Sequence, residues 1–333
     1  MMNRILDIKN LQVSLPTANG VLRAVRGIDL HVDKGEMLCI VGESGCGKSM
    51  TSMALMGLLP KRAEVTAEVL DFDGLDLLSL PKKERNKIRG MRMSMIFQEP
   101  MTSLNPSYTL GNQLCEAIMR HKGVSSAEAK ERAVYLLTRA GVPMPEKRLD
   151  QYPHQLSGGL RQRVMIAMAL MCEPDLIIAD EPTTALDVTI QAQILRLIRE
   201  LQQEFGTAVI FITHDLGVVA RIADRVAVMY AGQVVETATA QELYSNPMHP
   251  YTRGLLNCIP IPGKTAPGSH LESIPGVVPS LIGELKGCAF ANRCHVSTSE
   301  CSQRTPSLEL EPNSTSLHQV RCPITATTLQ EAM

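Results

Sequence analysis

The sequence predicts an α/β fold, in which a mixed sheet with an antiparallel subdomain is joined to a helical subdomain and a loop-rich C-terminal extension. Three observations support this prediction. Leu176–Ala179 and Ala208–Ile212 are continuous apolar strands on either side of a helix, which is typical of a buried parallel sheet. Ile5–Leu15 and Leu22–Val32 alternate apolar and polar residues, as antiparallel strands with one solvated face do. Between Leu110 and Leu149 the period becomes helical.

Composition limits the class of protein. The 333 residues suffice for one large domain with an appendage or for two domains, and the formal net charge is −1. Charged residues are spread evenly, so we expect no nucleic-acid partner. The longest apolar run, Val164–Cys172, is far too short to span a bilayer, and no signal-peptide pattern is present. We expect a soluble, cytosolic chain with one domain over residues 1–258, a helical subdomain at about 100–170, and an extension over 259–333.

The remaining elements follow in order along the chain. A turn is expected at Asp73-Gly74, and the stretch after residue 258 is rich in turn residues. The other predicted elements are a strand at Met37–Val41, a helix at Met50–Leu59, a charged helix at residues 82–90, a strand at Met91–Phe97, and a hairpin of Arg225–Tyr230 with Gln233–Thr237.

A glycine-rich loop carries the strongest chemical signal. Residues 42–49 match G-x-x-x-x-G-K-[ST], a phosphate-binding loop between a strand and a helix. Glycines let backbone N–H groups surround phosphate oxygens, while the lysine reaches the β- and γ-phosphates and the serine can bind Mg²⁺. The sequence therefore predicts ATP or a related triphosphate as ligand, with Mg²⁺. The residues expected to bind it are Gly42, Glu43, Ser44, Gly45, Cys46, Gly47, Lys48 and Ser49.

Two adjacent carboxylates end the apolar strand that begins at Leu176. We expect Asp180 to hold Mg²⁺ together with Ser49, and Glu181 to orient or deprotonate the attacking water. The alternative, that this Asp-Glu pair only caps the following helix, is less consistent with a phosphate loop upstream.

The stretch Leu156-Ser-Gly-Gly-Leu-Arg-Gln162 resembles the signature sequence of ATP-binding-cassette (ABC) ATPases. The family's other landmarks follow in its order: Gln98 after a strand, Asp180-Glu181, Ala185-Leu-Asp187, and His214 after a strand. The resemblance covers residues 1 to about 258 and implies an ABC-type P-loop NTPase core.

This resemblance implies specific roles. Two cassettes sandwich two ATP molecules, so Ser157, Gly158 and Gly159 would bind the nucleotide held by the partner's phosphate loop. Asp187 is implied as a further nucleotide-binding residue. The catalytic residues implied are Glu181, with His214 contacting the γ-phosphate, and Gln98 sensing Mg²⁺ or water where the helical insertion meets a membrane partner.

Two departures from the family pattern stand out. No aromatic residue precedes Phe72, so Leu15 or Arg23 must replace the usual stacking partner of adenine. Cys46 lies inside the phosphate loop, beside backbone N–H groups and Lys48, so we expect a lowered thiol pKa and reaction with maleimide.

Later segments narrow the family. His249-Pro-Tyr-Thr252, Ile274–Pro279 and Met95–Pro106 are similar to the corresponding segments of cassettes that power oligopeptide, dipeptide and nickel importers. The implied function is ATP-driven peptide import, by a peripheral subunit on the cytoplasmic face of the inner membrane. The implied partners are two transmembrane permease subunits, an extracytoplasmic solute-binding protein and a second, homologous ATPase in a heterodimer. The alternatives are a nickel or metal-chelate importer, a soluble cassette ATPase without a transport role, and a regulatory nucleotide-binding module.

Four cysteines mark the tail. Cys288, Cys294, Cys301 and Cys322 lie in a segment with little apolar core, and cytosolic thiols do not normally form stable disulfides. Four thiolates could hold Zn²⁺ or a [4Fe-4S] cluster, and the absence of C-x₂-C pairs disfavours zinc. Resemblance to peptide-importer ATPases with a four-cysteine tail favours the cluster. His295 or His318 could replace one ligand, and four unlinked thiols are the remaining alternative.

Overall fold

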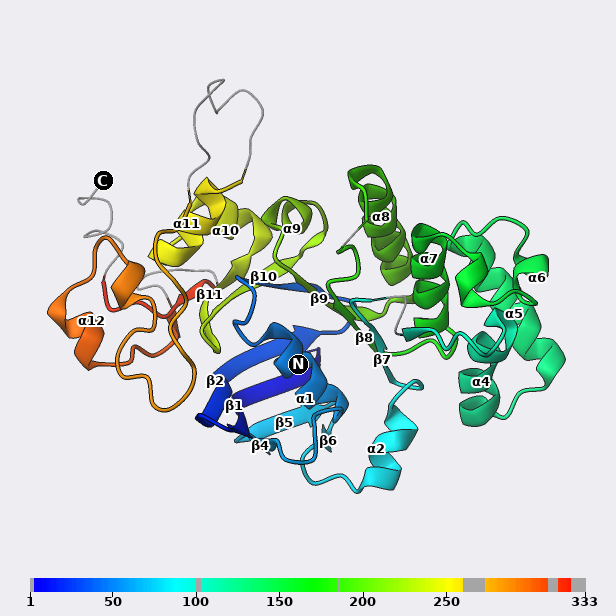
Figure 1. Cartoon of the computed structure of the whole chain (residues 1–333), viewed down its shortest axis with the longest axis horizontal. Helices are drawn as coiled ribbons and strands as arrows, with labels where there is room; N and C mark the ends of the chain where they lie inside the picture. Colours follow the sequence, from blue (N-terminus) through cyan, green and yellow to red (C-terminus); the bar gives the residue numbers. More distant parts are fainter. Residues whose placement is uncertain (1–2, 100–102, 185, 260–272, 311–316, 325–333) are drawn as a thin grey trace. The chain divides into compact units, whose positions relative to one another are not determined.

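The computed structural model describes residues 3–99, 103–184, 186–259, 273–310 and 317–324 (Figure 1). The chain divides into two compact units, each assembled from separate stretches. The first unit contains the chain up to Asp7, His31–Met37 and Asp71–Ile212. The second contains Ile8–Leu30, Leu38–Leu70 and the chain from Thr213 onward.

Parallel strands form the centre of the first unit. β8 (Leu176–Asp180) pairs in parallel with both β7 (Met93–Ile96) and β9 (Ala208–Thr213). Every residue of β8 and β9 is buried, which confirms the prediction drawn from their continuous apolar sequences. A tight hairpin of β5 (Val69–Phe72) and β6 (Leu75–Asp76) turns at the predicted Asp73-Gly74, where both residues have positive φ.

Helices make up most of the rest of the first unit. The apolar residues that recur at helical spacing between residues 110 and 149 lie in the core, as the predicted helical period requires: Leu114, Ile118, Ala133, Leu136 and Leu137 are all buried. The helices are α2 (Lys82–Ile88), α4 (Leu110–Lys122), α5 (Ser126–Arg139), α6 (Pro145–Arg148), η1 (Pro153–Gln155), α7 (Gly158–Ala169) and α8 (Val188–Phe205).

The second unit contains the mixed sheet. β3 (Met37–Val41) runs parallel to β10 (Arg225–Tyr230), which is antiparallel to β11 (Gln233–Thr239). The predicted β10–β11 hairpin is confirmed, because Ala231 and Gly232 both adopt the positive φ that a two-residue turn requires. The antiparallel strands are β1 (Arg4–Thr17), β2 (Gly20–Asp33) and β4 (Glu64–Thr66), and β1 pairs with β4.

The helix after the glycine-rich loop differs from the prediction. α1 (Lys48–Met56) begins two residues earlier than expected and ends before Leu58, because Gly57 adopts a left-handed conformation that terminates the helix. The other helices of this unit are α9 (Leu216–Ile222), α10 (Ala240–Ser245), α11 (Pro250–Asn257), η2 (Ala291–Arg293) and α12 (Ser299–Gln303).

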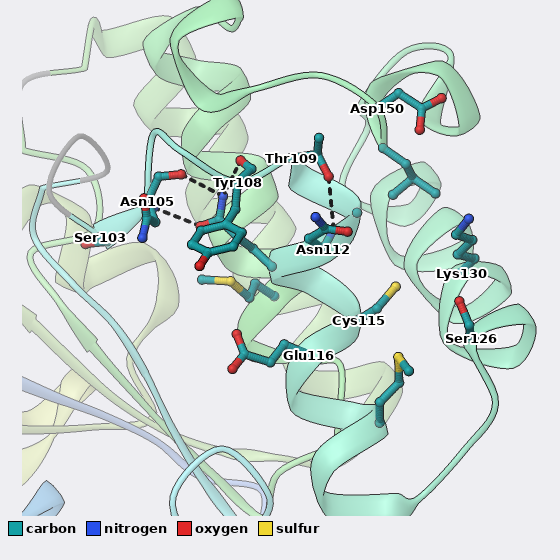
Figure 2. Close-up of a pocket in the computed structure, with 15 residues that line it drawn as sticks. Ser103, Asn105, Tyr108, Thr109, Asn112, Cys115, Glu116, Ser126, Lys130 and Asp150 are labelled. Carbon is teal, nitrogen blue, oxygen red and sulfur yellow. Dashed lines mark hydrogen bonds between the residues drawn. The ribbon is translucent and has the colours of Figure 1, made fainter.

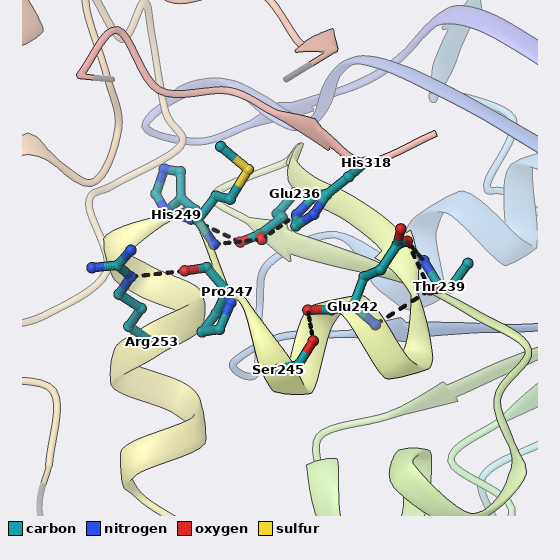
Figure 3. Close-up of polar contacts among 9 residues, drawn as sticks. Glu236, Thr239, Glu242, Ser245, Pro247, His249, Arg253 and His318 are labelled. Carbon is teal, nitrogen blue, oxygen red and sulfur yellow. Dashed lines mark hydrogen bonds and ion pairs between the residues drawn. The ribbon is translucent and has the colours of Figure 1, made fainter. Parts of the chain in front are cut away.

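The tail adds two short strands that the sequence pattern did not predict. β13 (Gln319–Val320) pairs with β11 and with β12 (Glu309–Leu310). Beside it, His318 Nε2 lies 2.7 Å from the fully buried carboxylate of Glu236 on β11 (Figure 3). The same carboxylate accepts hydrogen bonds from the backbone N–H groups of Met248 and His249 at 2.7 and 2.8 Å. Glu236 therefore joins three segments of the second unit around one buried charge.

Candidate functional site

The glycine-rich loop lies in the second unit, between β3 and α1. All five residues of β3 are buried, so the loop starts from a rigid strand end. A Cβ added to Gly42 would lie 2.1 Å from the Met229 carbonyl oxygen, and one added to Gly47 would lie 2.5 Å from that of Ala24. Both glycines also have positive φ. Only glycine therefore fits these two positions of the motif.

Lys48 lies inside this loop and is 5% exposed. Its Nζ donates hydrogen bonds to the carbonyl oxygens of Gly42 at 2.7 Å and Glu43 at 3.1 Å. It also begins α1, whose N-terminus carries partial positive charge. An ammonium group and a helix N-terminus thus meet in one place, and both favour an anionic ligand such as phosphate.

The prediction of a reactive Cys46 is wrong. The side chain is 1% exposed, and burial raises the pKa of the thiol by more than the neighbouring Lys48 ammonium lowers it. The thiol is packed inside the loop, since its Sγ lies 2.9 Å from where a Cβ on Gly42 would be. The sequence predicts a cation beside the thiol, but it does not indicate that the Cys46 side chain is buried.

The two carboxylates lie in the first unit, at the end of β8. Asp180 is 5% exposed. Glu181 has φ of +46°, a left-handed conformation that costs a non-glycine residue roughly 1–2 kcal/mol. Its N–H group donates to the Ile212 carbonyl oxygen at 3.0 Å. Backbone strain of this kind is typical of functional sites.

Gln98 joins Glu181 in the same unit. β7 and β8 are parallel, with Ile96 opposite Ala179, so Gln98 and Glu181 follow the same ends of neighbouring strands. Gln98 Nε2 donates to Glu181 Oε2 at 3.1 Å, and Thr184 Oγ1 donates to the same oxygen at 2.9 Å. Two predicted site residues that lie 83 positions apart in the sequence are therefore joined by a hydrogen bond.

The signature residues form an exposed helix start. Ser157 caps α7 by accepting a hydrogen bond from the Leu160 N–H group at 3.4 Å, and Ser157 and Gly158 are exposed. A Cβ on Gly158 would meet nothing within 4 Å, whereas one on Gly159 would lie 3.2 Å from Ile190 Cγ2. Asp187 caps α8, accepting from the Ile190 N–H group at 2.9 Å. This part of the first unit presents backbone N–H groups of a helix N-terminus to its surroundings.

The predicted residues divide between the two units. Gln98, Ser157, Gly158, Gly159, Asp180, Glu181 and Asp187 belong to the first unit, and residues 42–49 and His214 belong to the second. His214 directly follows β9 in the sequence and is exposed. Ala185, part of the Ala-Leu-Asp landmark, lies outside the described residues, as do Pro100–Thr102.

The four cysteines of the tail are the predicted metal ligands. The described part of the chain, which includes all four cysteines, contains no group of three or more Cys, His, Asp or Glu side chains arranged to hold a metal ion. The geometry therefore does not support the predicted iron–sulfur site. The four thiols nevertheless influence one another: burial, and then the charges of Cys288, Cys294 and Cys301, raise the pKa of Cys322 to about 11.

A cavity of about 760 Å³ opens in the helical part of the first unit (Figure 2). It is lined by polar side chains of α4 and the segment before it, including Asn105, Asn112 and Glu116, and by Lys130 of α5. Sequence reasoning did not identify this cavity. No helix in the described ranges is long and apolar enough to cross a membrane.

Sequence reasoning also missed a contact between the tail and the glycine-rich loop. The Arg293 guanidinium pairs with the Glu43 carboxylate, and the Tyr251 hydroxyl accepts a hydrogen bond from the Glu43 N–H group. The motif that contains Tyr251 does not indicate a contact with the glycine-rich loop. Nothing in the spacing of Arg293 indicates a partner 250 residues away.

The chain is similar in sequence to known ATP-binding proteins of transporters. The family model "ABC transporter" matches residues 25–184, and "Oligopeptide/dipeptide transporter, C-terminal region" matches residues 235–301. The chain is 54% identical over 296 residues to the oligopeptide transport ATP-binding protein OppD of Bacillus subtilis, which covers 87% of this chain and 81% of that protein. It is 51% identical over 322 residues to the dipeptide transport ATP-binding protein DppD of the same organism, covering 96% and 95%.

Solved structures show the same fold. The dimeric ATP-binding cassette MJ0796, in a post-hydrolysis state bound to ADP and Pi, aligns with a TM-score of 0.62 at 29% identity, covering 71% of this chain and 98% of that one. The predicted fold class is thereby confirmed.

Proposed function

The chain belongs to the ABC transporter family, among relatives of its peptide transport ATP-binding proteins, and on this basis we propose that it is the ATP-hydrolysing subunit of a peptide importer. The observation that carries the proposal is the pairing of Gln98 with a strained Glu181 in a chain that also holds an intact phosphate loop. A purely regulatory nucleotide-binding module has no need of that carboxylate.

ATP binding is assigned to residues 42–49. The ammonium of Lys48, already bonded to two loop carbonyl oxygens, can turn to the β- and γ-phosphates. Mg²⁺, when bound with ATP, would neutralise phosphate charge. Oxygen ligands suit this cation, and we propose the hydroxyl of Ser49, the buried carboxylate of Asp180 and the amide of Gln98 as its ligands. Leu15 or Arg23 remains our prediction for the adenine contact.

Hydrolysis is assigned to Glu181. Its carboxylate would orient the attacking water and accept a proton from it, while the hydrogen bonds from Gln98 and Thr184 hold Oε2 in place. His214 would contact the γ-phosphate and complete the alignment of the water. These groups position the reactants, which is the main contribution of a protein to phosphoryl transfer.

A second ATPase subunit is part of the proposal. Exposed Ser157 and Gly158, with Gly159, form the start of α7, which is suited to the γ-phosphate of an ATP held by a partner. Asp187, which caps α8, is proposed as a further nucleotide-binding residue. We propose a heterodimer with a homologous ATPase, so that each ATP is bound by the loop of one subunit and the signature residues of the other.

The transport partners are two transmembrane permeases and an extracytoplasmic solute-binding protein. We propose that a permease segment enters the polar cavity beside α4, shown in Figure 2, and that the chain therefore works at the cytoplasmic face of the inner membrane. Di- or oligopeptides are the proposed substrates, because the two relatives described above are oligopeptide and dipeptide transport proteins. Import of nickel or a metal chelate is the alternative within the same subfamily.

The tail is proposed to hold a [4Fe-4S] cluster. In such a cluster each cysteine binds a different iron, so the thiols need not converge on one ion as they do for zinc. Cys288, Cys294 and Cys301 act electrostatically on Cys322, so the four thiols lie near one another, as a shared cluster requires. Anaerobic purification should give a brown protein that loses its colour in the Cys301→Ser variant. A colourless preparation without iron would overturn this part of the proposal.

Reconstitution tests the main proposal. The chain, purified with its permeases and partner ATPase in proteoliposomes, should hydrolyse ATP and accumulate a radiolabelled peptide when the solute-binding protein is present. Lys48→Ala in this chain should abolish both activities. Peptide uptake that persists in the Lys48→Ala transporter, or uptake of nickel instead of peptide, would contradict it.

A further inference from the structure

We propose that Arg293 and Tyr251, both from the C-terminal part of the chain, are positioning residues for ATP binding, which act through Glu43 of the phosphate loop. This inference rests on the proposed assignment of residues 42–49 as the ATP-binding loop. It gives the extension a direct part in nucleotide binding, in addition to any role in holding a cluster.

Arg293 binds the carboxylate of Glu43 through both terminal nitrogens of its guanidinium group. Nη1 lies 2.7 Å from Oε2 and Nη2 lies 3.1 Å from Oε1, the bidentate geometry that makes such pairs strong. The arginine side chain is only 4% exposed, whereas that of Glu43 is 30% exposed. An ion pair this well shielded on one side is not an ordinary surface pair.

The guanidinium is itself held in place by the tail. Arg293 Nε donates to the Pro275 carbonyl oxygen at 2.8 Å, and Nη2 donates to that of Ile274 at 3.1 Å. The group also lies over the rings of Tyr230 and Phe290, at 5.8 and 5.9 Å from their centres. An arginine guanidinium is always protonated in proteins, so the cation is permanent.

Tyr251 fixes the backbone of the same loop residue. Its hydroxyl oxygen accepts a hydrogen bond from the Glu43 N–H group at 2.9 Å. The ring is fully buried, 4.6 Å from the Tyr230 ring and 5.4 Å from the Phe290 ring, measured between centres. The side chain and the backbone of Glu43 are therefore both tied to the C-terminal part of the chain.

The charge of Glu43 explains why its contact with Arg293 should affect the binding of ATP. Its carbonyl oxygen accepts a hydrogen bond from Lys48, so the residue lies next to the group that binds phosphate. An unpaired carboxylate on this residue would repel the triphosphate and compete for the lysine. Arg293 reduces that repulsion by pairing with the carboxylate, and Tyr251 holds the backbone of the loop at Glu43.

The structure offers a matched control for general damage to the tail. Arg321 is also a buried tail arginine, but its guanidinium bonds the carbonyl oxygens of Val234 and Pro306, at 2.8 and 3.0 Å, away from the loop. Replacing either arginine removes one charge and several hydrogen bonds. Only Arg293→Ala also frees the carboxylate of Glu43.

The test measures ATP affinity and turnover of the full-length chain, assembled with its partner subunits. Arg293→Ala should raise the KM for ATP roughly tenfold, in line with the loss of a charged hydrogen-bonded pair, while kcat changes less than twofold. Arg293→Lys should restore part of the affinity, and Arg321→Ala should leave the KM close to that of the parent. Tyr251→Phe should raise the KM with little change in kcat.

A double variant separates a charge effect from a structural one. In the Glu43→Gln background no carboxylate needs neutralising, so adding Arg293→Ala should raise the KM less than twofold. An equal, roughly tenfold increase in both backgrounds would overturn the proposal, as would an increase in Arg321→Ala as large as that in Arg293→Ala. ATP binding of Lys48→Ala is measured in parallel. If Lys48→Ala binds ATP like the parent, the assignment of residues 42–49 as the ATP-binding loop is wrong. If Lys48→Ala loses ATP binding while the Arg293 and Tyr251 variants keep the parental KM, only the proposed role of Arg293 and Tyr251 is wrong.

Discussion

Replacing His249 with asparagine should make the chain less sensitive to acid. His249 precedes α11, is 1% exposed, and its Nδ1 accepts the Tyr251 N–H group at 3.0 Å, so the neutral ring is required. Burial lowers its pKa from 6.5 to about 4, against the opposing charge of Glu236, and Arg321 lowers it further. The unfolded chain therefore takes up a proton near pH 6.5, whereas the folded chain does so only near pH 4.

The sign and size of the effect follow from this difference. Stability from neutral His249 is fully present above pH 6.5 and is lost as the pH falls toward 4, because only the unfolded chain gains the proton. Between pH 7.5 and pH 5 the loss is about 2 kcal/mol. Asparagine accepts the same cap hydrogen bond but does not titrate. Its smaller volume gives a penalty that does not depend on pH.

Urea unfolding at the two pH values measures this difference. Tyrosine fluorescence is a suitable signal, since the chain has no tryptophan and Tyr230 and Tyr251 are fully buried in the second unit. The parent should lose about 2 kcal/mol more than His249→Asn between pH 7.5 and pH 5. His318 and Glu236 are present in both proteins, so the two proteins differ only at position 249. Equal losses in the two proteins would refute the reasoning.

Three further predictions concern the site. Glu181→Gln should bind ATP with parental affinity but lose steady turnover in the assembled transporter, so that ATP-bound dimers accumulate; parental turnover would show that another group orients the water. Gly47→Ala should destabilise the loop by at least about 1 kcal/mol, because left-handed strain adds to a 2.5 Å approach to the Ala24 carbonyl oxygen. The melting temperature should fall further than in Gly45→Ala, which has left-handed strain as well, at φ of +79°, but a Cβ that meets nothing within 4 Å. Cys46 should react with maleimide no faster than buried Cys39, and peptide mapping that found it modified first would restore the reactive thiol.

Much of the fold follows from periodicity. β8 and β9 are apolar at every position before their last residue, and only a sheet covered on both faces accommodates such strands, so their parallel pairing could be predicted. The boundaries were harder to predict. α1 stops at Gly57 because that residue leaves the helical conformation, although the apolar pattern continues to Leu59. The pairing of β13 with β11 depends on two residues whose sequence has no strand signature.

Within the site, local motifs were predictable and long-range contacts were not. The glycines of the loop and the pair Asp180-Glu181 follow from chemistry at fixed spacing. The inward turn of Cys46 and the pairing of Arg293 with Glu43 depend on tertiary packing, since 250 residues separate the two partners of that ion pair. A charge beside a thiol predicts a low pKa only where water reaches the thiol, and burial reversed the sign here.

The strained conformation of Glu181 and the tail contact of Glu43 point to a common principle. Each is a carboxylate that local sequence would leave free, and in each case another segment restrains it: the Gln98 amide in the first unit and the Arg293 guanidinium in the second. A free carboxylate near a triphosphate is repelled by it and can move out of place. A carboxylate held by a hydrogen-bond donor keeps its position at a cost in strain or desolvation. Ordering the two carboxylates before ATP arrives means that ATP binding does not have to supply the energy to align them.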